Sequence, residues 1–391
     1  MRTNRTRGIL RRPLGLPCLL SILFLNCLAP AHAIEPLDIE SDLAITVDGR
    51  MRHAGIDEAM ALLNVPSLSL ALIDEDRIAL ARAYGPGATP DTLYQAASLS
   101  KFVTAVGAVR LIEAGQLILD ENVNAKLTSW RVPANTFDKD HAVTLRGLLS
   151  MTGGIGVPGF AGYAAGTPLP ALTQILDGTP PANSPPVTVI AVPGSAYHYS
   201  GGGYEIVEAL VFDIAHVPYP EVMEDLVLEL AGMRHSTFTQ PLPQHLAGHA
   251  AAGHFGDGKE IPGRWRVVPE HAAGGLWSTP SDLANLLILV GRAWRGESRL
   301  FLAPETVREM LTRQNGGPYG LGAAIAEKNS VTLVMKRGQN VGYQSYLVLL
   351  PASGQGLVVM TNSDNGSILA EALIRRAAVL YDWLLPDILP D

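Results

Sequence analysis

The segment Ser98-Leu99-Ser100-Lys101 places a hydroxyl and an amine three positions apart. An apolar-periodic stretch follows and ends at Gly115, so both side chains are predicted on one face of a helix N-terminus. A serine hydroxyl becomes a nucleophile only when a base removes its proton. Lys101 can be that base if burial and nearby cations lower its pKa, and the Ser98 amide can stabilise an oxyanion. A capping serine followed by a solvated lysine is the alternative interpretation.

Two later segments carry side chains that could complete such a site. Tyr199 lies in the run Tyr197–Tyr204 beside three glycines, where backbone or a ligand can approach closely. A tight turn with aromatic packing is the alternative there. The segment Lys336-Arg337-Gly338-Gln339-Asn340 follows a predicted strand, and a cation with a glycine at a strand edge suits an anionic substrate that pairs with the edge. Charge that protects a sheet edge is the alternative for this segment.

The elements that must position these residues come from both ends of the chain. Alternating apolar residues predict a hairpin over 67–84 and three antiparallel strands within 331–360. Helical patterns cover 56–63 and 369–384. The simplest assembly is an α+β fold in which helices flank one five-stranded antiparallel sheet.

This assembly predicts a discontinuous domain organisation. Residues 34–115 and 264–391 would form the α/β sheet domain, and residues 116–263 an inserted helical or irregular domain. Proline removes backbone donors, so the proline-rich stretch 156–194 is predicted to be a loop. A linker between independent domains is the alternative, but apolar residues interrupt the stretch and favour an ordered loop.

The N-terminus has the three-part pattern of a secretory signal peptide. Residues 1–12 hold five arginines and no acid, an apolar run follows, and Ala31-His32-Ala33 predicts cleavage after Ala33. The run is shorter than the roughly 20 residues that a membrane span requires. A membrane anchor, a lipid on Cys27 and a twin-arginine signal at Arg11-Arg12 are the alternatives. We therefore expect a signal peptide over residues 1–33 and a periplasmic or secreted protein.

Composition and charge exclude several classes of function. Hydrophobic residues make up 47% and charged residues 17% of the 391, which is typical of a globular chain and not of a disordered one. The formal net charge is −8, and loss of the arginine-rich leader makes the rest more acidic. We expect no nucleic-acid partner, because an acidic surface repels phosphate backbones. Both cysteines, Cys18 and Cys27, lie in the leader, so disulfides and a thiol nucleophile are excluded from the mature chain.

The order of three motifs resembles a known family. Ser98-x-x-Lys101, Tyr199-Ser200-x and Lys336-x-Gly338 resemble the motifs of class C serine β-lactamases, penicillin-binding DD-peptidases and family VIII esterases. The resemblance covers nearly the whole chain after the leader. It implies a DD-peptidase/transpeptidase-like fold with the site between a sheet domain and a helical domain. Further segments that resemble family patterns are Gly115–Asp120, Val143–Gly154, Pro269–Leu283, Tyr319–Gly322 and Gly338–Tyr343.

The resemblance implies catalytic roles for three residues. Ser98 would be the nucleophile that forms an acyl-enzyme. Lys101 and Tyr199 would share the general base and acid work, with Lys336 favouring a tyrosinate. Which of Lys101 and Tyr199 is the principal base stays open, because interacting groups titrate together.

The resemblance also implies the substrate-binding residues. The amides of Ser98 and Gln339 would form the oxyanion hole. Lys336 and Arg337 would attract a substrate carboxylate. Class C enzymes carry an asparagine whose side chain binds the substrate amide, and Gly201 stands in its place. We therefore expect ester hydrolysis to be faster than β-lactam hydrolysis. The predicted substrate-binding set is Lys336, Arg337, Gly338, Gln339 and Gly201.

Three other motifs are interpreted as structural. Ser363-Asp364-Asn365 follows Lys336, the reverse of the order in class A β-lactamases, and is predicted to be a turn. Gly154-x-Gly156-x-x-Gly159 lacks the preceding strand that a dinucleotide fingerprint requires. His245-x-x-x-His249, with His254 nearby, lacks the glutamate of the H-E-x-x-H zinc motif. We expect no metal and no other cofactor.

Three hypotheses about function follow. The first is a secreted serine hydrolase that acts on a small ester, D-amino-acid amide or β-lactam. The second is a peptidoglycan DD-carboxypeptidase or endopeptidase. The third is a non-catalytic penicillin-binding module, which is disfavoured because Ser98, Lys101 and Tyr199 are all present. The expected partner is a small-molecule or peptidoglycan-derived substrate, with no membrane span after signal cleavage, and the sequence leaves the oligomeric state undetermined.

Overall fold

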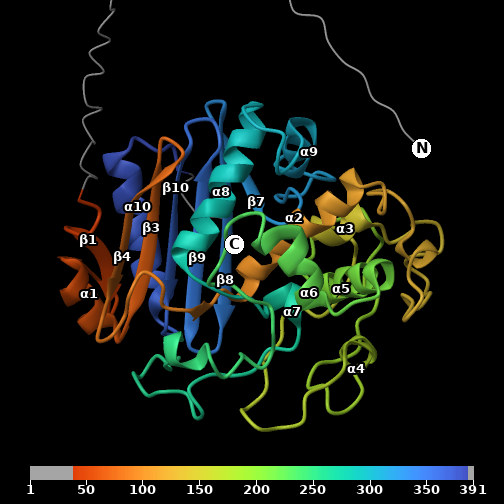
Figure 1. Cartoon of the computed structure of the whole chain (residues 1–391), viewed down its shortest axis with the longest axis horizontal. Helices are drawn as coiled ribbons and strands as arrows, with labels where there is room; N and C mark the ends of the chain where they lie inside the picture. The colour runs from red at the N-terminus through yellow and green to blue at the C-terminus, as the bar shows by residue number, and fades with distance from the viewer. Residues whose placement is uncertain (1–37, 386–391) are drawn as a thin grey trace, which may run out of the picture. The chain divides into compact units, whose positions relative to one another are not determined.

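The fold is built around one six-stranded antiparallel sheet, whose strands run in the order β4-β3-β10-β9-β8-β7 (Figure 1). The computed structural model describes residues 38–385, so the predicted signal peptide and both cysteines lie outside the described residues. The strands of this sheet are β3 (Leu68–Asp74), β4 (Arg77–Tyr84), β7 (Ala324–Lys328), β8 (Val331–Asn340), β9 (Tyr343–Leu350) and β10 (Gln355–Thr361).

Helices surround this sheet, and two smaller strand pairs lie outside it. β1 (Leu43–Val47) pairs with β2 (Arg50–Ala54), and β5 (Tyr94–Gln95) pairs with β6 (Trp277–Ser278). None of the helices in residues 38–385 has the length and apolar character to cross a membrane. The helices are α1 (Ile56–Leu63), α2 (Ser100–Glu113), α3 (Leu145–Leu149), α4 (Leu172–Asp177), α5 (Gly201–Ala215), α6 (Tyr219–Met223), α7 (His271–Gly274), α8 (Pro280–Arg295), α9 (Pro304–Met310) and α10 (Gly366–Leu380).

The sequence predicted five strands, and the structure has a sixth, β7, at the sheet edge. β7 pairs only with β8 and ends in the exposed residues Glu327 and Lys328. Charge on an edge strand discourages pairing with other chains, but it also breaks the alternating apolar pattern by which strands are recognised. β8 is longer than predicted, so the segment Lys336–Asn340 lies within the strand and not after it.

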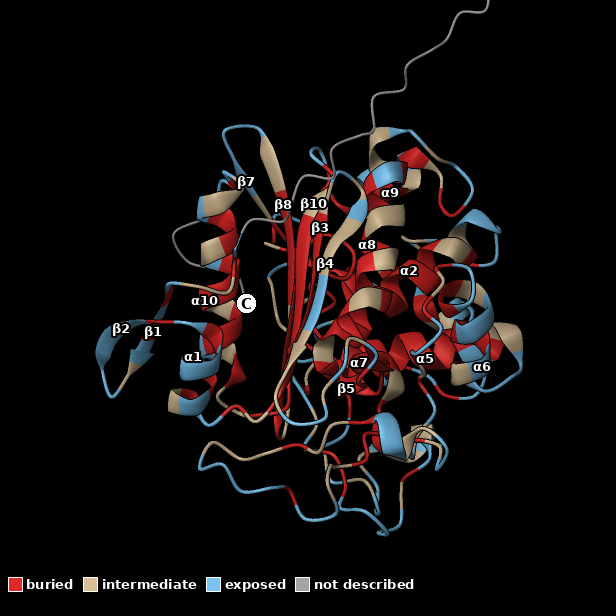
Figure 2. Cartoon of the chain, turned by 60° about the vertical axis from the view of Figure 1, so that its left-hand side comes forward, coloured by how far each residue is buried: buried red, intermediate tan, exposed pale blue. Residues whose placement is uncertain are grey.

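Both faces of the sheet are covered by helices, as the alternation along β3 shows. Leu70 and Leu72 belong to the core shared with α1 and α10, whereas Ala71 and Ile73 belong to the core shared with α2 and α8. Successive side chains of a strand point to opposite faces, and here both faces are buried. Figure 2 shows the buried central strands between these two groups of helices, with the edge strand β4 partly exposed.

The chain between α2 and α8 contains the long helix α5, which lies beside α2, together with short helices and long loops (Figure 1). The described residues form one compact unit. The predicted division into a sheet domain and an inserted domain therefore stays a prediction.

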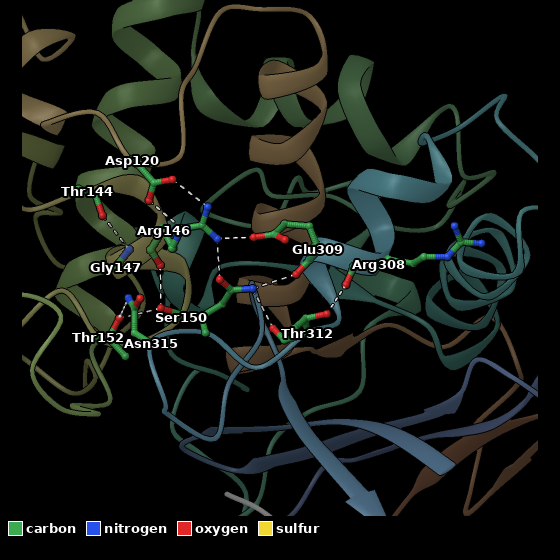
Figure 3. A network of polar contacts seen from close by, with 11 residues as sticks. Asp120, Thr144, Arg146, Gly147, Ser150, Thr152, Arg308, Glu309, Thr312 and Asn315 are labelled. Atoms are coloured by element: carbon green, nitrogen blue, oxygen red, sulfur yellow. Dashed lines mark hydrogen bonds and ion pairs between the residues drawn. The ribbon is translucent and has the colours of Figure 1, made fainter. Parts of the chain in front are cut away.

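A polar network around Arg146 joins α3 to the segment that follows α9 (Figure 3). The Arg146 guanidinium donates to Asp120 Oδ1 at 2.7 Å and to Gln314 Oε1 at 2.6 Å, and it also contacts Glu309. The backbone N–H of Gln314 donates to the backbone carbonyl of Tyr319 at 2.8 Å. The network thereby fixes the loop that carries Tyr319, which contacts the site described below.

Candidate active site

Ser98 lies in a short 3₁₀ turn, Ala97–Leu99, and α2 begins two residues later, at Ser100. Ala97 has a φ of +50°, the left-handed conformation that L-residues other than glycine rarely adopt. The Ser100 hydroxyl stabilises this turn, because it donates to the Ala97 carbonyl at 2.6 Å and accepts from the Leu276 amide at 3.1 Å. The turn leaves Ser98 half-buried at the wall of a cavity.

Lys101 is held against Ser98 from the first turn of α2. Its Nζ donates to Ser98 Oγ at 3.0 Å and to the carbonyl of Ala273 at 2.6 Å. Only 2% of Lys101 is exposed. Burial restricts the side chain to this one position, in which its amine contacts the candidate nucleophile directly.

Tyr199 lies between two lysines. Lys336 Nζ donates to the Tyr199 hydroxyl at 3.1 Å and to the Tyr319 hydroxyl at 3.2 Å. Lys101 Nζ lies 5.3 Å from the centre of the Tyr199 ring. Residues from α2, from the start of α5 and from β8 therefore converge on one phenol.

The two lysines make this phenol unusually acidic. Burial alone would raise the pKa of Tyr199, but the charges of Lys101 and Lys336 and a hydrogen bond with Ser98 outweigh burial and lower the pKa to about 7. Burial also lowers the pKa of Lys336, with Tyr199 opposing the shift and Lys101 adding to it. A substantial fraction of Tyr199 is therefore phenolate at neutral pH and can accept a proton.

Strand β8 packs against the turn Ala97–Leu99 that carries Ser98. Gly338 permits this close approach. A Cβ at position 338 would lie 2.4 Å from the Ala96 carbonyl oxygen and 2.9 Å from the Ser98 nitrogen, so only glycine fits. β7 pairs with β8 over residues 331–335 alone. The following half, 336–340, pairs with β9 only, and residues of this half line the cavity.

The cavity has a volume of about 490 Å³ and is cationic. Three of its residues, Lys101, Lys336 and Arg337, are positively charged, and its lining contains no Asp or Glu. This charge favours an anionic substrate. Of the residues predicted from the sequence, Gly338 lies beneath the nucleophile turn and Gly201 lies outside the lining. Those that line the cavity are Ser98, Lys101, Tyr199, Lys336, Arg337 and Gln339.

Gly201 is buried against the segment that contains Pro158 and Phe160, and it lies outside the lining of the substrate cavity. Its amide donates to the Pro158 carbonyl at 3.1 Å. A Cβ at position 201 would lie 3.0 Å from Phe160 Cε2 and 3.3 Å from the Pro158 oxygen. The Ser200 hydroxyl, which caps α5, also donates to the Gly156 carbonyl at 2.7 Å. Phe160 therefore packs where a side chain at position 201 would begin.

Sequence reasoning assigned no role to three residues that complete the site. The ring of Tyr319 packs edge-on against Tyr199, with centroids 6.4 Å apart, and the Tyr-Gly-Leu-Gly motif was the available signal. Phe160 lies in the proline-rich stretch and lines the cavity. Ala273 contributes only its carbonyl oxygen, which no side-chain pattern can reveal.

Ser363–Asn365 takes no part in this arrangement, whereas Gly159, the last glycine of the Gly154-x-Gly156-x-x-Gly159 segment, lines the cavity. Ser363–Asn365 forms the turn between β10 and α10, where Ser363 Oγ donates to the Asn64 carbonyl. Within residues 38–385, no three His, Cys, Asp or Glu side chains are grouped in a way that could hold a metal ion.

Comparison with known proteins gives a consistent result. The Beta-lactamase family model matches residues 54–381. Protein flp of Staphylococcus aureus (strain MW2) is 23% identical over 323 residues, which cover 77% of this chain but 60% of that relative's length.

Two solved structures share the fold with a TM-score of 0.66 each. The octameric penicillin-binding protein homologue of Pyrococcus abyssi is 24% identical, with 83% of this chain and 76% of that chain covered. The D-amino acid amidase of Ochrobactrum anthropi SV3, solved with L-phenylalanine, is 19% identical, with 83% and 96% covered.

Proposed function

Because this chain belongs to the Beta-lactamase family of serine hydrolases, we propose that it hydrolyses a small ester, amide or β-lactam through an acyl-enzyme on Ser98. One observation carries the proposal. Lys101 Nζ lies 3.0 Å from Ser98 Oγ, and the phenol that shares their cavity, Tyr199, has its pKa lowered to about 7. A nucleophile and a base that is ionised at neutral pH thus share one cavity.

The acylation step uses these groups as follows. Ser98 Oγ attacks the substrate carbonyl carbon and gives its proton to the Tyr199 phenolate. The amides of Ser98 and Gln339 stabilise the oxyanion of the tetrahedral intermediate. The bond to the leaving group then breaks, and the leaving group takes the proton from Tyr199. Lys101 holds the Ser98 hydroxyl in place and stabilises the phenolate throughout.

Deacylation reverses the proton path. Water attacks the acyl carbon and gives a proton to the Tyr199 phenolate. The Ser98 oxygen leaves and recovers that proton from Tyr199, and the product acid departs. The same phenol thus acts as base and then as acid in each half-reaction, which requires a pKa close to the working pH.

The lining of the cavity supports a substrate with an apolar acyl group and an anionic group. Phe160, Tyr197 and Val268 supply apolar surface, and Lys336 and Arg337 supply positive charge. Gly201 brings no side chain to the cavity, so the site lacks the amide-binding asparagine of class C enzymes. The missing asparagine supports hydrolysis of esters in preference to β-lactams, whereas the two cations suit any substrate that carries a carboxylate.

A second candidate is a DD-carboxypeptidase or endopeptidase acting on peptidoglycan peptides. The observation in its favour concerns residues 336–340 of β8, which pair with β9 but not with β7. This segment includes the cations Lys336 and Arg337. A peptide could pair its backbone with this edge and direct its terminal carboxylate toward the two cations.

We also propose that the enzyme is exported to the periplasm or beyond. The support is the sequence pattern of residues 1–33. Expression of the whole chain in a Gram-negative host and intact-mass measurement of the periplasmic fraction tests this. We expect the mass of a chain that begins at Ile34. Full-length protein confined to the cytoplasm contradicts export.

Intact-mass spectrometry with a substrate panel tests the reaction. Wild-type protein and Ser98→Ala are incubated with short-chain nitrophenyl esters, D-amino-acid amides, D-Ala-D-Ala peptides and penicillins. We expect an acyl adduct on Ser98 of the wild type and a loss of turnover of at least about 10⁴-fold in the variant. Full turnover by Ser98→Ala contradicts the mechanism, and adducts without turnover favour the non-catalytic module.

The same panel, with a chromogenic cephalosporin added, distinguishes the substrates. We expect kcat/KM for a short-chain nitrophenyl ester to exceed kcat/KM for a chromogenic cephalosporin. A clear preference for the cephalosporin contradicts the ester assignment. Release of D-alanine from the peptide at a higher kcat/KM than either supports the DD-carboxypeptidase instead.

A further inference from the structure

Three buried acids lie at α7, the helix whose Ala273 carbonyl holds Lys101, and take no part in the proposed reaction. Glu205 and Glu270 have no exposed surface, and Glu208 is 4% exposed. Burying a carboxyl group costs free energy unless its oxygens find partners. Three such groups within one small region therefore require a structural reason, and the contacts of Glu205 and Glu208 supply one.

Glu205 and Glu208 hold the backbone of α7. They lie three residues apart on α5 and so face the same side of that helix. Glu205 Oε1 accepts from the Ala273 amide at 3.1 Å, and Glu208 Oε2 accepts from the Ala272 amide at 3.0 Å. The first amides of a helix have no partner within it, and α7 starts at His271, so the two glutamates satisfy donors that would otherwise be buried unpaired.

The carbonyls of the same two residues are held by α2. Lys101 Nζ donates to the Ala273 carbonyl at 2.6 Å, and Thr104 Oγ1 donates to the Ala272 carbonyl at 3.0 Å. Ala272 and Ala273 are therefore held through their amides by the helix that follows Tyr199, and through their carbonyls by the helix that follows Ser98. α7 acts as a spacer between the two helices that carry the candidate catalytic groups.

We propose that Glu205 and Glu208 are positioning residues for Lys101. Glu205 fixes Ala273, whose carbonyl holds the Lys101 amine, and Glu208 fixes the neighbouring peptide. The inference rests on the proposed function, because its consequence is that Lys101 Nζ stays 3.0 Å from Ser98 Oγ. A misplacement of about 1 Å in such a group can cost roughly 100-fold in rate.

The surroundings of Glu205 disfavour its charged form. Burial, and then the charges of Glu208 and Glu270, raise its pKa well above the usual range, against the opposing effects of the Ala273 amide and Lys101. The other titratable groups around it are His271, which contacts Glu208 Oε1 at 2.8 Å, and Tyr219, which is hydrogen-bonded to Thr104 at 2.6 Å. The bond to the Ala273 amide needs only an acceptor oxygen, which a glutamine side chain also offers, so glutamine should replace Glu205.

The test compares Glu205→Gln with Glu205→Leu. Leucine has similar volume but offers no acceptor to the Ala273 amide. Readouts are the rate at which a fluorophosphonate probe labels Ser98, followed by intact mass, and kcat and KM for a nitrophenyl ester. We expect Glu205→Gln to stay within about threefold of wild type, and Glu205→Leu to lose roughly 30- to 100-fold in labelling rate and kcat with little change in KM.

Asp213→Leu is the matched control. Asp213 lies on the same helix and also accepts from two backbone amides, those of Thr128 at 2.7 Å and Ser129 at 3.0 Å, but it lies outside the cavity lining. This variant should lose thermal stability and keep its labelling rate within about threefold, because the loop that it holds carries no catalytic group.

Four outcomes overturn the inference. If folded Glu205→Leu is labelled as fast as the wild type, the inference is wrong and the proposed function is unaffected. The same holds if Asp213→Leu loses as much labelling rate as Glu205→Leu. A folded wild type that is not labelled on Ser98 overturns the proposed function and this inference with it. If Glu205→Leu fails to fold, Glu208→Leu serves in its place, with a loss of about tenfold expected and an unchanged rate contradicting the inference.

Discussion

Two buried regions that hold ionisable groups, one basic and one acidic, meet at α7. The cationic cleft consists of Lys101, Lys336 and Tyr199, and the acidic cluster consists of Glu205, Glu208 and Glu270. In the cleft, the charged groups contact side chains at the wall of a cavity. In the cluster, Glu205 and Glu208 contact backbone amides.

Burial favours the neutral form of the ionisable groups in both regions, and it therefore shifts the pKa of bases and acids in opposite directions. It lowers the pKa of Lys336 and raises the pKa of Glu205 and Glu270. The regions differ in what their groups can reach, because only the cleft adjoins space for a substrate. A buried ionisable group is therefore a candidate for catalysis when it faces a cavity, and a candidate for positioning when it holds backbone.

The largest expected effect comes from removing the base of the cleft. Tyr199→Phe should lower kcat/KM for a nitrophenyl ester by about 10²- to 10⁴-fold. In the wild type, kcat/KM should fall below pH 7, because the pKa of Tyr199 is about 7 and only its phenolate accepts a proton. Tyr163→Phe, outside the cavity, should keep this profile. An unchanged inflection in Tyr199→Phe would show that another group is the base.

The cluster should respond to pH in the opposite direction and through stability. Burial and then Glu208 raise the pKa of Glu270 from 4.5 to about 7, although its own amide and His271 oppose the shift. The folded state then holds this proton more tightly than the unfolded chain. The free energy of unfolding should therefore fall as pH rises from 4.5 to 7, by up to roughly 3 kcal/mol. Beyond pH 7 this contribution is constant.

Urea unfolding of wild type and Glu270→Gln at pH 5 and pH 8 measures that loss. The Glu270→Gln variant should not show this fall. Its free energy of unfolding, relative to that of the wild type, should therefore be higher at pH 8 than at pH 5. Other titrating groups cancel in this difference. A difference that does not depend on pH would show that Glu270 keeps an ordinary pKa.

A smaller effect is expected from Lys336→Met, which removes one of the two charges on Tyr199. The inflection in the pH profile should move above pH 7, because this charge lowers the pKa of Tyr199. KM for a carboxylate-bearing ester should rise about tenfold, as expected for one lost charge-assisted contact, with KM for a neutral ester unchanged. Lys328→Met, at the end of β7, is the control. Equal changes for both esters would contradict carboxylate binding.

The smallest effect concerns the apolar wall of the cleft. Gly201→Asn alone should lower activity, because its Cβ would lie 3.0 Å from Phe160. In Phe160→Ala, the same substitution has room and brings an amide to the cavity. The ratio of kcat/KM for cephalosporin to that for ester should then rise up to tenfold over Phe160→Ala alone, the value of one hydrogen bond. A ratio that does not change would show that Gly201 does not set this preference.

Local patterns predicted much of the fold. The apolar spacing of residues 56–63 matches α1, and the two apolar runs within 67–84 located β3 and β4. The edge strand β7 escaped prediction because only its first residues are buried and its exposed end is charged, which leaves an apolar run too short to recognise.

The sequence by itself determined which groups are available and in what order, including the candidate nucleophile and its lysine one helical turn away. Tertiary structure alone decided what surrounds them. Ala273 reaches Lys101 across 172 positions of the chain, and Lys336 reaches Tyr199 across 137. Glu205 and Glu208 carried no sequence signal, because a pKa and a hydrogen bond depend on burial and distance in space. Spacing along one helix can be counted in the sequence, whereas the meeting of α2, α5, α7 and β8 exists only in the folded protein.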